Sequence, residues 1–228
     1  MKKPILALSS AFLLCISTAH AQKKSSPDGI TFGIRMGVNF QNVTGKDNNG
    51  DKLNNDIKTG YHLGANVELP VTDQIYIQPG LLFSAKGAKY NSDGATGSTG
   101  ISYIEMPVNI IYKSEMGSGK LFGGLGPYLA YGIGGKLDYK GNGVDVSKNI
   151  QFKNSVTLAD YIANFGAYLK PLDYGVNFLA GYELSNNLSA QLNFQLGLAK
   201  INPQIEGLSG SKATAKNMGF GLSVGYRF

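Results

Sequence analysis

The chain has 228 residues, of which 43% are hydrophobic, 11% aromatic and only 16% charged, and it contains 31 glycines. This composition excludes a disordered chain and a helical bundle, and it is typical of strands joined by many turns. The formal net charge of +6 includes Lys2 and Lys3, which belong to a targeting segment. The remaining excess of positive charge is too small to indicate nucleic-acid binding.

Residues 1–21 have the features of a secretory signal peptide. The two lysines form its charged start, residues 5–16 form its apolar centre, and an Ala-His-Ala sequence ending at Ala21 forms its cleavage site. The apolar centre has about a dozen residues, whereas a membrane-spanning helix needs roughly 20, so we expect cleavage after Ala21. A short periplasmic tail, residues 22–29, then precedes one domain, residues 30–228.

The only cysteine, Cys15, lies inside this targeting segment. A lipoprotein signal is the alternative interpretation, but the bulky Leu14 stands where lipoprotein processing requires a small residue. Once the segment is removed, the mature chain has no cysteine, which excludes disulfides and thiol catalysis.

Beyond residue 30, apolar residues alternate with polar residues or glycine, and no apolar run approaches 18 residues. In residues 188–198, for example, Leu192 and Phe194 share one face while Gln191 and Asn193 share the other. Such segments predict eight strands, at residues 32–40, 61–70, 75–86, 101–113, 120–132, 172–184, 188–198 and 217–228. Most are long for soluble sheets and match the roughly 9–11 residues with which a tilted strand crosses a membrane.

The connections between these strands alternate in length. Short turns are predicted at residues 71–74, 114–119 and 185–187, and long polar loops at residues 41–58, 87–100, 133–171 and 202–216. Within the longest loop, residues 136–149 are expected to form a hairpin around an Asn-Gly pair. This layout predicts an all-β, eight-stranded antiparallel up-and-down transmembrane β-barrel with both termini in the periplasm.

The apolar face carries aromatic residues near the ends of the predicted strands. Such rings are typical of the two membrane surfaces, whereas a soluble sandwich, the alternative fold, would bury this face. The expected girdles contain Phe32, Tyr112, Tyr182, Tyr226 and Phe228 on the turn side and Phe40, Tyr61, Phe83, Tyr131 and Tyr174 on the loop side.

The polar face, which would line the barrel, combines many glycines with a few charges. An eight-stranded barrel is only wide enough for side chains to fill it, so opposite charges are expected to pair across the lumen. The predicted network contains Arg35, Glu68, Glu105, Glu183, Arg227, Lys86 and Lys113, with Glu105 pairing with Lys86 or His62. We therefore predict a plugged barrel without a wide pore.

Several motifs resemble the PorT-like, or porin-family, outer-membrane β-barrel domain of Bacteroidetes. Residues 103–107 (Tyr-Ile-Glu-Met-Pro), 126–128 (Gly-Pro-Tyr) and 173–175 (Asp-Tyr-Gly) carry this resemblance over residues 30–228. The end of the chain, with Tyr226 and Phe228, resembles the C-terminal signal read by the barrel-assembly machinery. The resemblance implies an outer-membrane location and an eight-stranded barrel, and one branch of the family is linked to protein secretion and gliding.

The favoured function is a non-enzymatic outer-membrane protein that contacts lipid and presents extracellular loops, with no cofactor, no metal and no nucleic-acid partner. Tyr139, Phe152, Tyr161, Phe165 and Tyr168 make the longest loop a candidate surface for a protein partner, although these rings could instead pack over the barrel mouth. A small passive pore and an accessory role in secretion remain as alternatives.

Two site motifs are weak. His62, Ser84 and Glu105 all face inward near the loop end, the residue types of a lipid-modifying enzyme, but no nucleophile motif surrounds the serine. Residues 47–51 have the first spacings of a calcium loop, which fails because Lys52 and Lys58 occupy positions that require Gly and Glu.

Overall fold

The computed structural model describes residues 29–92, 94–141, 143–208 and 210–228. The predicted signal peptide, its cleavage site and nearly all of the predicted tail, residues 22–29, lie outside these residues. The elements are β1 (Thr31–Lys46), β2 (Asp56–Pro70), β3 (Ile75–Ser92), β4 (Ala95–Met116), β5 (Gly119–Gly141), β6 (Val144–Asn149), β7 (Gln151–Phe152), β8 (Ser155–Thr157), α2 (Leu158–Ala163), β9 (Tyr168–Leu169), β10 (Leu172–Glu183), β11 (Leu188–Gly197), β12 (Gln204–Glu206) and β13 (Thr214–Arg227).

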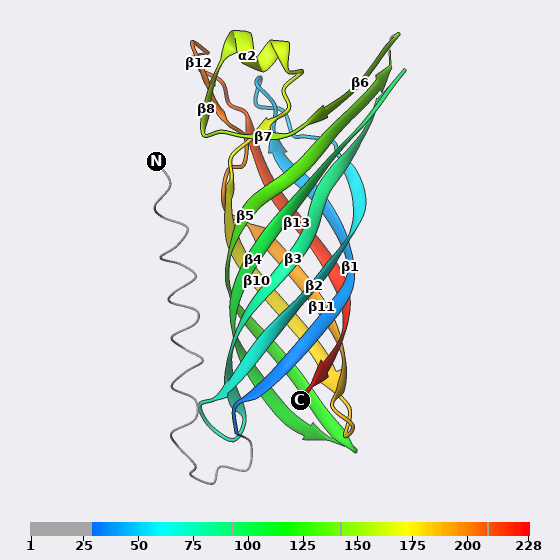
Figure 1. The fold of residues 1–228 in the computed structure, drawn as a ribbon, viewed down its shortest axis with the longest axis vertical. Helices are drawn as coiled ribbons and strands as arrows, with labels where there is room; N and C mark the ends of the chain where they lie inside the picture. Colours follow the sequence, from blue (N-terminus) through cyan, green and yellow to red (C-terminus); the bar gives the residue numbers. More distant parts are fainter. Residues whose placement is uncertain (1–28, 93, 142, 209) are drawn as a thin grey trace.

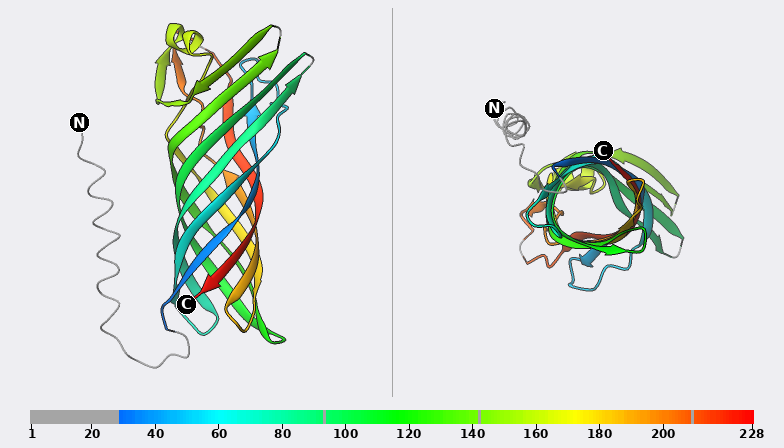
Figure 2. Two further views of the ribbon diagram at one scale, coloured as in Figure 1. Left: turned by 45° about the vertical axis from the view of Figure 1, so that its right-hand side comes forward. Right: turned by 90° about the horizontal axis from the view of Figure 1, so that it is seen from below.

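Eight antiparallel strands close into a barrel in the order β1-β2-β3-β4-β5-β10-β11-β13 (Figure 1). The ring is completed by β13 pairing with β1, from Gly33 opposite Arg227 to Lys46 opposite Thr214. Seen along its axis, the barrel is a closed ring (Figure 2). The predicted fold class is confirmed, and a two-sheet sandwich is excluded because these strands form one continuous ladder.

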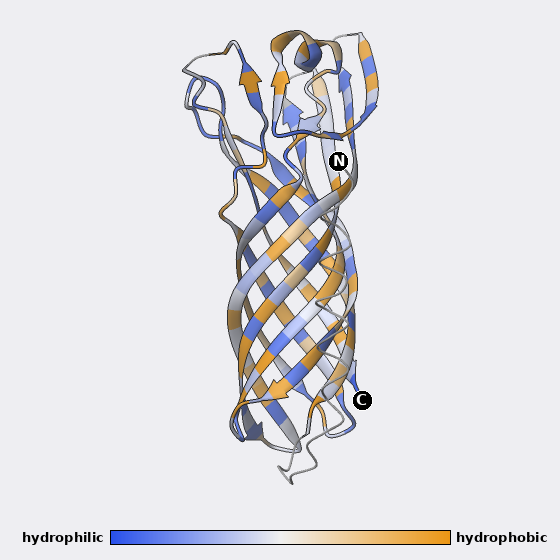
Figure 3. Ribbon diagram, turned by 60° about the vertical axis from the view of Figure 1, so that its left-hand side comes forward, coloured by the Kyte–Doolittle hydropathy of each residue, from blue (hydrophilic) through white to orange (hydrophobic). Residues whose placement is uncertain are grey.

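Successive residues of each barrel strand point alternately outward and inward. Figure 3 shows that hydrophobic and hydrophilic residues also alternate along these strands. Ile110 is 59% exposed and Leu192 58%, whereas inward Asn109 is 1% exposed. A sheet that exposes its apolar face and buries its polar face suits a lipid environment.

Glycines on the inward face permit close approach of neighbouring strands. A Cβ atom at Gly37 of β1 would collide with the backbone oxygen of Leu222 in β13. A Cβ at Gly126 of β5 would collide with the backbone oxygen of Val108 in β4. The glycine-rich pattern is thus a requirement of the narrow barrel.

We call the two ends of the barrel the turn end, where short turns connect the strands and the C-terminus lies, and the loop end, where β6 and α2 lie (Figure 1). The loop end is more ordered than predicted. The long loop predicted at residues 87–100 is wrong, because β3 and β4 remain paired as far as Ser92 and Ala95. The extension carries Ser, Thr and Gly residues and so lacks the apolar alternation that predicts a strand. The two strands nevertheless stay paired there, because backbone hydrogen bonds form wherever a neighbouring strand supplies partners.

The predicted hairpin at residues 136–149 is confirmed, because β5 and β6 pair from Lys136 opposite Asn149 to Gly141 opposite Val144. The rest of the long loop folds across the barrel mouth through two short parallel pairs, β7 with β9 and β8 with β12. Thr157 caps α2 by accepting a hydrogen bond from the Asp160 backbone N–H at 3.1 Å. In the described part of the chain, no helix has both the length and the apolar character needed to cross a membrane.

The interior is layered rather than uniformly polar. One apolar cluster lies toward the turn end and contains Tyr76, Ile111, Phe122 and Leu179. Another lies toward the loop end and contains Ile101, Tyr103, Tyr128, Ala130, Ile150 and Ile201. The charged groups of the lumen are packed against these layers.

Candidate functional site

A balanced ion cluster lies at the turn end of the lumen. Lys113 Nζ lies 2.8 Å from Glu68 Oε2 and 2.9 Å from Glu183 Oε2. Arg227 contacts the same two carboxylates, at 2.6 Å from Glu68 and 3.4 Å from Glu183. Gln78 also donates to Glu68, at 3.0 Å. Two cations between two anions satisfy one another, which offsets the desolvation cost of burying them.

A second cluster, toward the loop end, is centred on Lys86. Its Nζ lies 2.8 Å from Glu105 Oε2 and 3.5 Å from Asp173 Oδ2, and its side chain has no exposed surface. The same ammonium lies over the Tyr128 ring, 4.4 Å from the centroid. Asn217 donates to Asp173 at 2.9 Å. The pairing of Lys86 with Glu105 is one of the two that the sequence suggested.

Sequence reasoning missed Asp173 as a lumen charge. The alternation of the predicted strand does place Asp173 on the inward face, because Asp173 precedes outward-facing Tyr174 and is an even number of residues from inward-facing Glu183. Asp173 is fully buried and accepts a hydrogen bond from Tyr128 Oη at 3.3 Å as well. It ties β10 to β3, β5 and β13 across the lumen.

Arg35 does not join either cluster. Among the described residues it makes no ion pair, and its buried Nε has no hydrogen-bond partner. The expectation that all seven charges pair is therefore wrong for this residue. Glu105 is already occupied by Lys86 and by Gln195, which donates at 2.6 Å, and Glu68 is occupied by Lys113 and Arg227.

The middle of the lumen holds a neutral hydrogen-bond chain. His62 Nδ1 lies 2.8 Å from Asn39 Oδ1, and its Nε2 lies 2.8 Å from Ser223 Oγ. Ser84 bonds to Asn39 rather than to His62, and Glu105 bonds to Lys86, so the trio suggested for a lipid-modifying enzyme is not assembled. Ser223, His62 and Asn39 have the order of a nucleophile, a base and an orienting group. However, the adjacent cavity measures about 40 Å³, which has room for water but not for an acyl group.

The residues of the expected girdles lie on the outward face of the barrel. Two cross-strand ring pairs mark the loop side, with centroids 5.1 Å apart for Phe40 and Phe220 and 5.6 Å apart for Tyr61 and Phe83. The strands continue beyond these rings, since β3 ends only at Ser92, so on this side the aromatics do not fall at strand ends as expected. The other outward-facing aromatic residues of the prediction are Phe32, Tyr112, Tyr182, Tyr131 and Tyr174.

At the C-terminus, the Tyr226 and Phe228 rings pack edge to face with centroids 5.0 Å apart. The Phe228 backbone N–H donates to the Phe32 carbonyl at 2.7 Å, which joins the last residue to the first strand. The terminal pair thus lies at the seam where the barrel closes.

A cavity of about 460 Å³ occupies the loop end, above the apolar cluster. Its floor includes Ile101, Ile150 and Ile201, which belong to that cluster. Four of the five aromatic residues predicted for the long loop line it: Tyr139, Tyr161, Phe165 and Tyr168. The fifth, Phe152, packs against the apolar cluster instead. The loop therefore folds over the barrel mouth and encloses a space there. We call this space the outer cavity.

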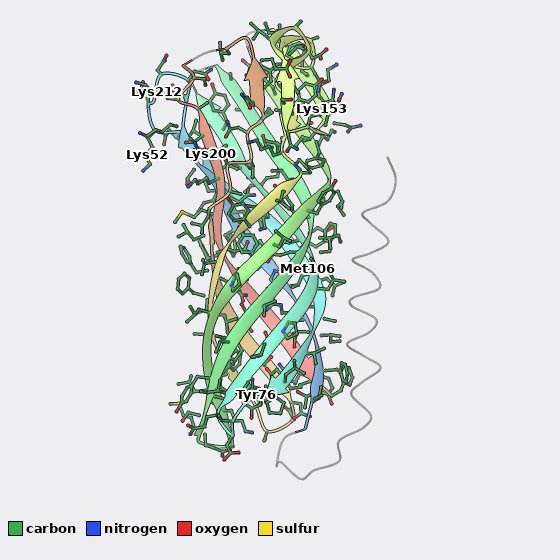
Figure 4. The ribbon with its side chains drawn as sticks, turned by 90° about the vertical axis from the view of Figure 1, so that its left-hand side faces the viewer. Lys52, Tyr76, Met106, Lys153, Lys200 and Lys212 are labelled. Carbon is green, nitrogen blue, oxygen red and sulfur yellow. The ribbon has the colours of Figure 1, made fainter. Side chains whose placement is uncertain are left out.

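Lysines surround the outer cavity. Lys89 lines it, and Lys58 donates to the lining residue Ser98 at 3.0 Å. Lys153 lies over the Tyr168 ring at 5.4 Å, and Lys148 over the Phe165 ring at 6.0 Å. Other lysines of the loop end are labelled in Figure 4, namely Lys52, Lys200 and Lys212.

One acidic residue, Asp138, lines the outer cavity. Its carboxylate accepts a hydrogen bond from Ser147 at 2.6 Å and lies 3.5 Å from Lys136 Nζ. The Ser147 hydrogen bond and the lysine lower the pKa of Asp138 below its ordinary value, so the carboxylate is ionised and already neutralised by its neighbours. Of the two charged lining residues, Lys89 is thus the one without an ion pair among the described residues.

No group of residues suited to hold a metal ion occurs in the ranges that the structure describes. A further cavity of about 340 Å³ opens at the turn end and is lined by the ionic groups of Lys113, Glu183 and Arg227. It is the outer side of the turn-end cluster.

Several solved structures resemble this chain in fold. Ail, the attachment invasion locus protein of Yersinia pestis, has 15% sequence identity and a TM-score of 0.39, and the match covers 87% of this chain and 98% of Ail. Neisserial surface protein A has 14% identity and a TM-score of 0.40, with 88% and 98% covered. The N-terminal β-barrel domain of Pseudomonas aeruginosa OprF has 13% identity and a TM-score of 0.32, with 86% and 97% covered. Similarity this remote carries no functional argument.

Sequence comparison is more decisive about the family. No curated protein sequence matches the chain. Residues 20–202 match the outer membrane protein beta-barrel domain family, a range that includes the strands from β1 to β11. The chain therefore belongs to the outer membrane protein beta-barrel domain family.

Proposed function

We propose that this protein is a closed, non-enzymatic barrel whose loop end faces the cell exterior and serves as a binding scaffold. The observation that carries the proposal is the presence of two ion clusters across the lumen, the Lys86 cluster and the turn-end cluster. Two cavities in the described part of the lumen measure about 40 Å³, beside His62, and about 20 Å³, beside Arg227. Spaces of this size hold isolated waters and do not form a continuous channel.

The orientation belongs to the same proposal. The short turns and the C-terminus would lie in the periplasm, the apolar outer face would contact outer-membrane lipid, and Tyr226 and Phe228 would be read by the barrel-assembly machinery. The long loop-end extensions support this orientation, because outer-membrane barrels have short periplasmic turns and longer extracellular segments.

Planar-bilayer recording tests the closed lumen against the alternative of a small passive pore. The purified mature chain should insert without producing reproducible unitary conductance steps, while an open porin reconstituted in parallel should produce them. Because each cluster joins a buried lysine to a carboxylate at 2.8 Å across the lumen, we expect this result over the whole range of applied voltage. Reproducible steps from the protein would overturn the proposal.

A protein partner at the loop end is a second proposal, and α2 favours it. Ile162 is 67% exposed and Phe165, just beyond the helix, is 52% exposed, which leaves apolar surface open to solvent at the tip of the molecule. An accessory role in secretion would require such a contact, and membership of the PorT-like family, one branch of which is linked to secretion, belongs to the same proposal. Deleting the gene and comparing the exported proteins tests this role, and an unchanged set of exported proteins would argue against it.

A further inference from the structure

The outer cavity has the size and the surface of a small-molecule site. Its volume of about 460 Å³ falls within the roughly 300–1,000 Å³ of ligand pockets. Apolar side chains from separate elements converge on it, among them Tyr90 from β3, Leu137 from β5, and Leu169 from β9. A space of this kind favours an acyl chain or a ring system.

The charged residues around the outer cavity favour a negatively charged ligand. Lys89 lines the cavity and makes no ion pair within the described part of the chain, and Lys58 is held at the wall by Ser98. The acidic lining residue, Asp138, is already paired with Lys136. A carboxylate entering here would gain lysine partners, whereas an ammonium group would meet like charge.

Phe165 defines the entrance to the outer cavity. It lines the cavity while half of its surface remains exposed, so its ring lies where the cavity meets solvent. Its φ of 51° is in the left-handed region, which is uncommon for a bulky residue, and Gly166 follows with a φ of 71°. These values belong to the turn that ends α2, in which the Phe165 N–H donates to the Ile162 carbonyl at 3.1 Å and the Gly166 N–H donates to the Tyr161 carbonyl at 2.8 Å, so the helix end fixes the backbone that carries the Phe165 ring.

The floor of the outer cavity is closed. The apolar cluster beneath the cavity includes Tyr103 and Tyr128. The Lys86 ammonium packs against both of these rings, 5.3 Å and 4.4 Å from their centroids. A ligand that enters from the loop end is therefore retained and not passed into the lumen.

From these features we propose that the outer cavity binds a small amphipathic anion, with an acyl or aromatic body and one carboxylate, of the class of medium-chain fatty acids. This inference names a ligand class for the binding scaffold proposed above. It rests on that proposal in one respect, namely that the loop end must be accessible to the ligand. Apolar burial supplies most of the affinity, and Lys89 with Lys58 supplies the preference for an anion.

Equilibrium dialysis of radiolabelled decanoate against the mature chain in lipid nanodiscs tests the site, with empty nanodiscs measuring uptake by lipid alone. We expect one saturable site per barrel above the lipid background. Decyltrimethylammonium, which has the same chain and the opposite charge, should compete at least tenfold less well. Absence of saturable binding above empty nanodiscs, or equal competition by the cation, would overturn the proposal.

Matched variants locate the site. Lys89→Gln should weaken decanoate binding about threefold, whereas Lys52→Gln, a change at an exposed lysine elsewhere on the loop end, should not. Phe165→Ala should weaken binding about fivefold, whereas Ile162→Ala, in the same segment but outside the cavity lining, should not. Equal effects within either pair would contradict the assignment of the cavity.

The conductance and binding experiments separate the two proposals. A barrel that conducts ions but binds decanoate with the expected variant pattern would overturn the closed lumen and retain the site. A silent barrel that fails to bind decanoate would retain the closed lumen and overturn the site.

Discussion

Lys86 is the residue on which the loop-side ion cluster depends, because it is the cation shared by Glu105 and Asp173. Replacing it by Met keeps the length of the side chain but leaves two carboxylates buried without a cation. Removing one partner of a buried ion pair costs about 3–5 kcal/mol. We expect Lys86→Met to lower the free energy of unfolding by about this amount, measured by urea titration with far-UV circular dichroism.

A matched exposed pair provides the control. Lys140 Nζ lies 3.9 Å from Asp145 Oδ2, with both side chains more than 70% exposed. Lys140→Met should therefore leave the urea midpoint almost unchanged, because solvent screens such pairs. If Lys86→Met proved as stable as the unchanged protein, the loop-side cluster would not be a structural plug.

Glycines within the barrel strands allow neighbouring strands to approach closely. In β5, a Cβ at Gly126 would collide with backbone of β4, whereas nothing lies within 4 Å of a Cβ at Gly134. Gly126→Val should prevent normal pairing of β4 with β5 and cost about 1–3 kcal/mol or more, since backbone cannot move aside as a flexible side chain can. Gly134→Val, in the same strand, should be tolerated.

Refolding yield into detergent micelles measures this difference, read as the fraction of chain that migrates in the folded position on an unboiled gel. We expect a large loss for Gly126→Val and a yield near that of the unchanged protein for Gly134→Val. Equal yields for the two variants would show that the approach of β4 and β5 does not limit assembly.

The whole molecule is a closed ladder without free barrel edges, because β1 pairs with β13 and β5 pairs with β10. Every barrel strand therefore has backbone partners on both sides, which makes the fold resistant to unfolding by detergent. We expect the mature chain to migrate differently on a gel before and after boiling, with a strand-rich circular dichroism spectrum before boiling. A protein that stays soluble without detergent and shows no shift in mobility would contradict the membrane barrel.

The local alternation of apolar and polar residues was sufficient to predict the barrel architecture. Period-two alternation determined the eight barrel strands and the face on which each side chain lies, as for outward Leu192 and inward Glu105. Alternation is a property of each strand by itself, so it can be read without knowing the neighbouring strands. The same rule applied to Asp173 would have placed it in the lumen.

Only the tertiary structure decided which inward groups meet. Lys86 and Asp173 are 87 positions apart in the sequence, and they lie together because ring closure and strand stagger bring them to one level of the barrel. The same stagger leaves Arg35 without an ion pair among the described residues. The outer cavity likewise depends on how residues 150–171 fold across the mouth, through contacts between distant elements that no local pattern specifies.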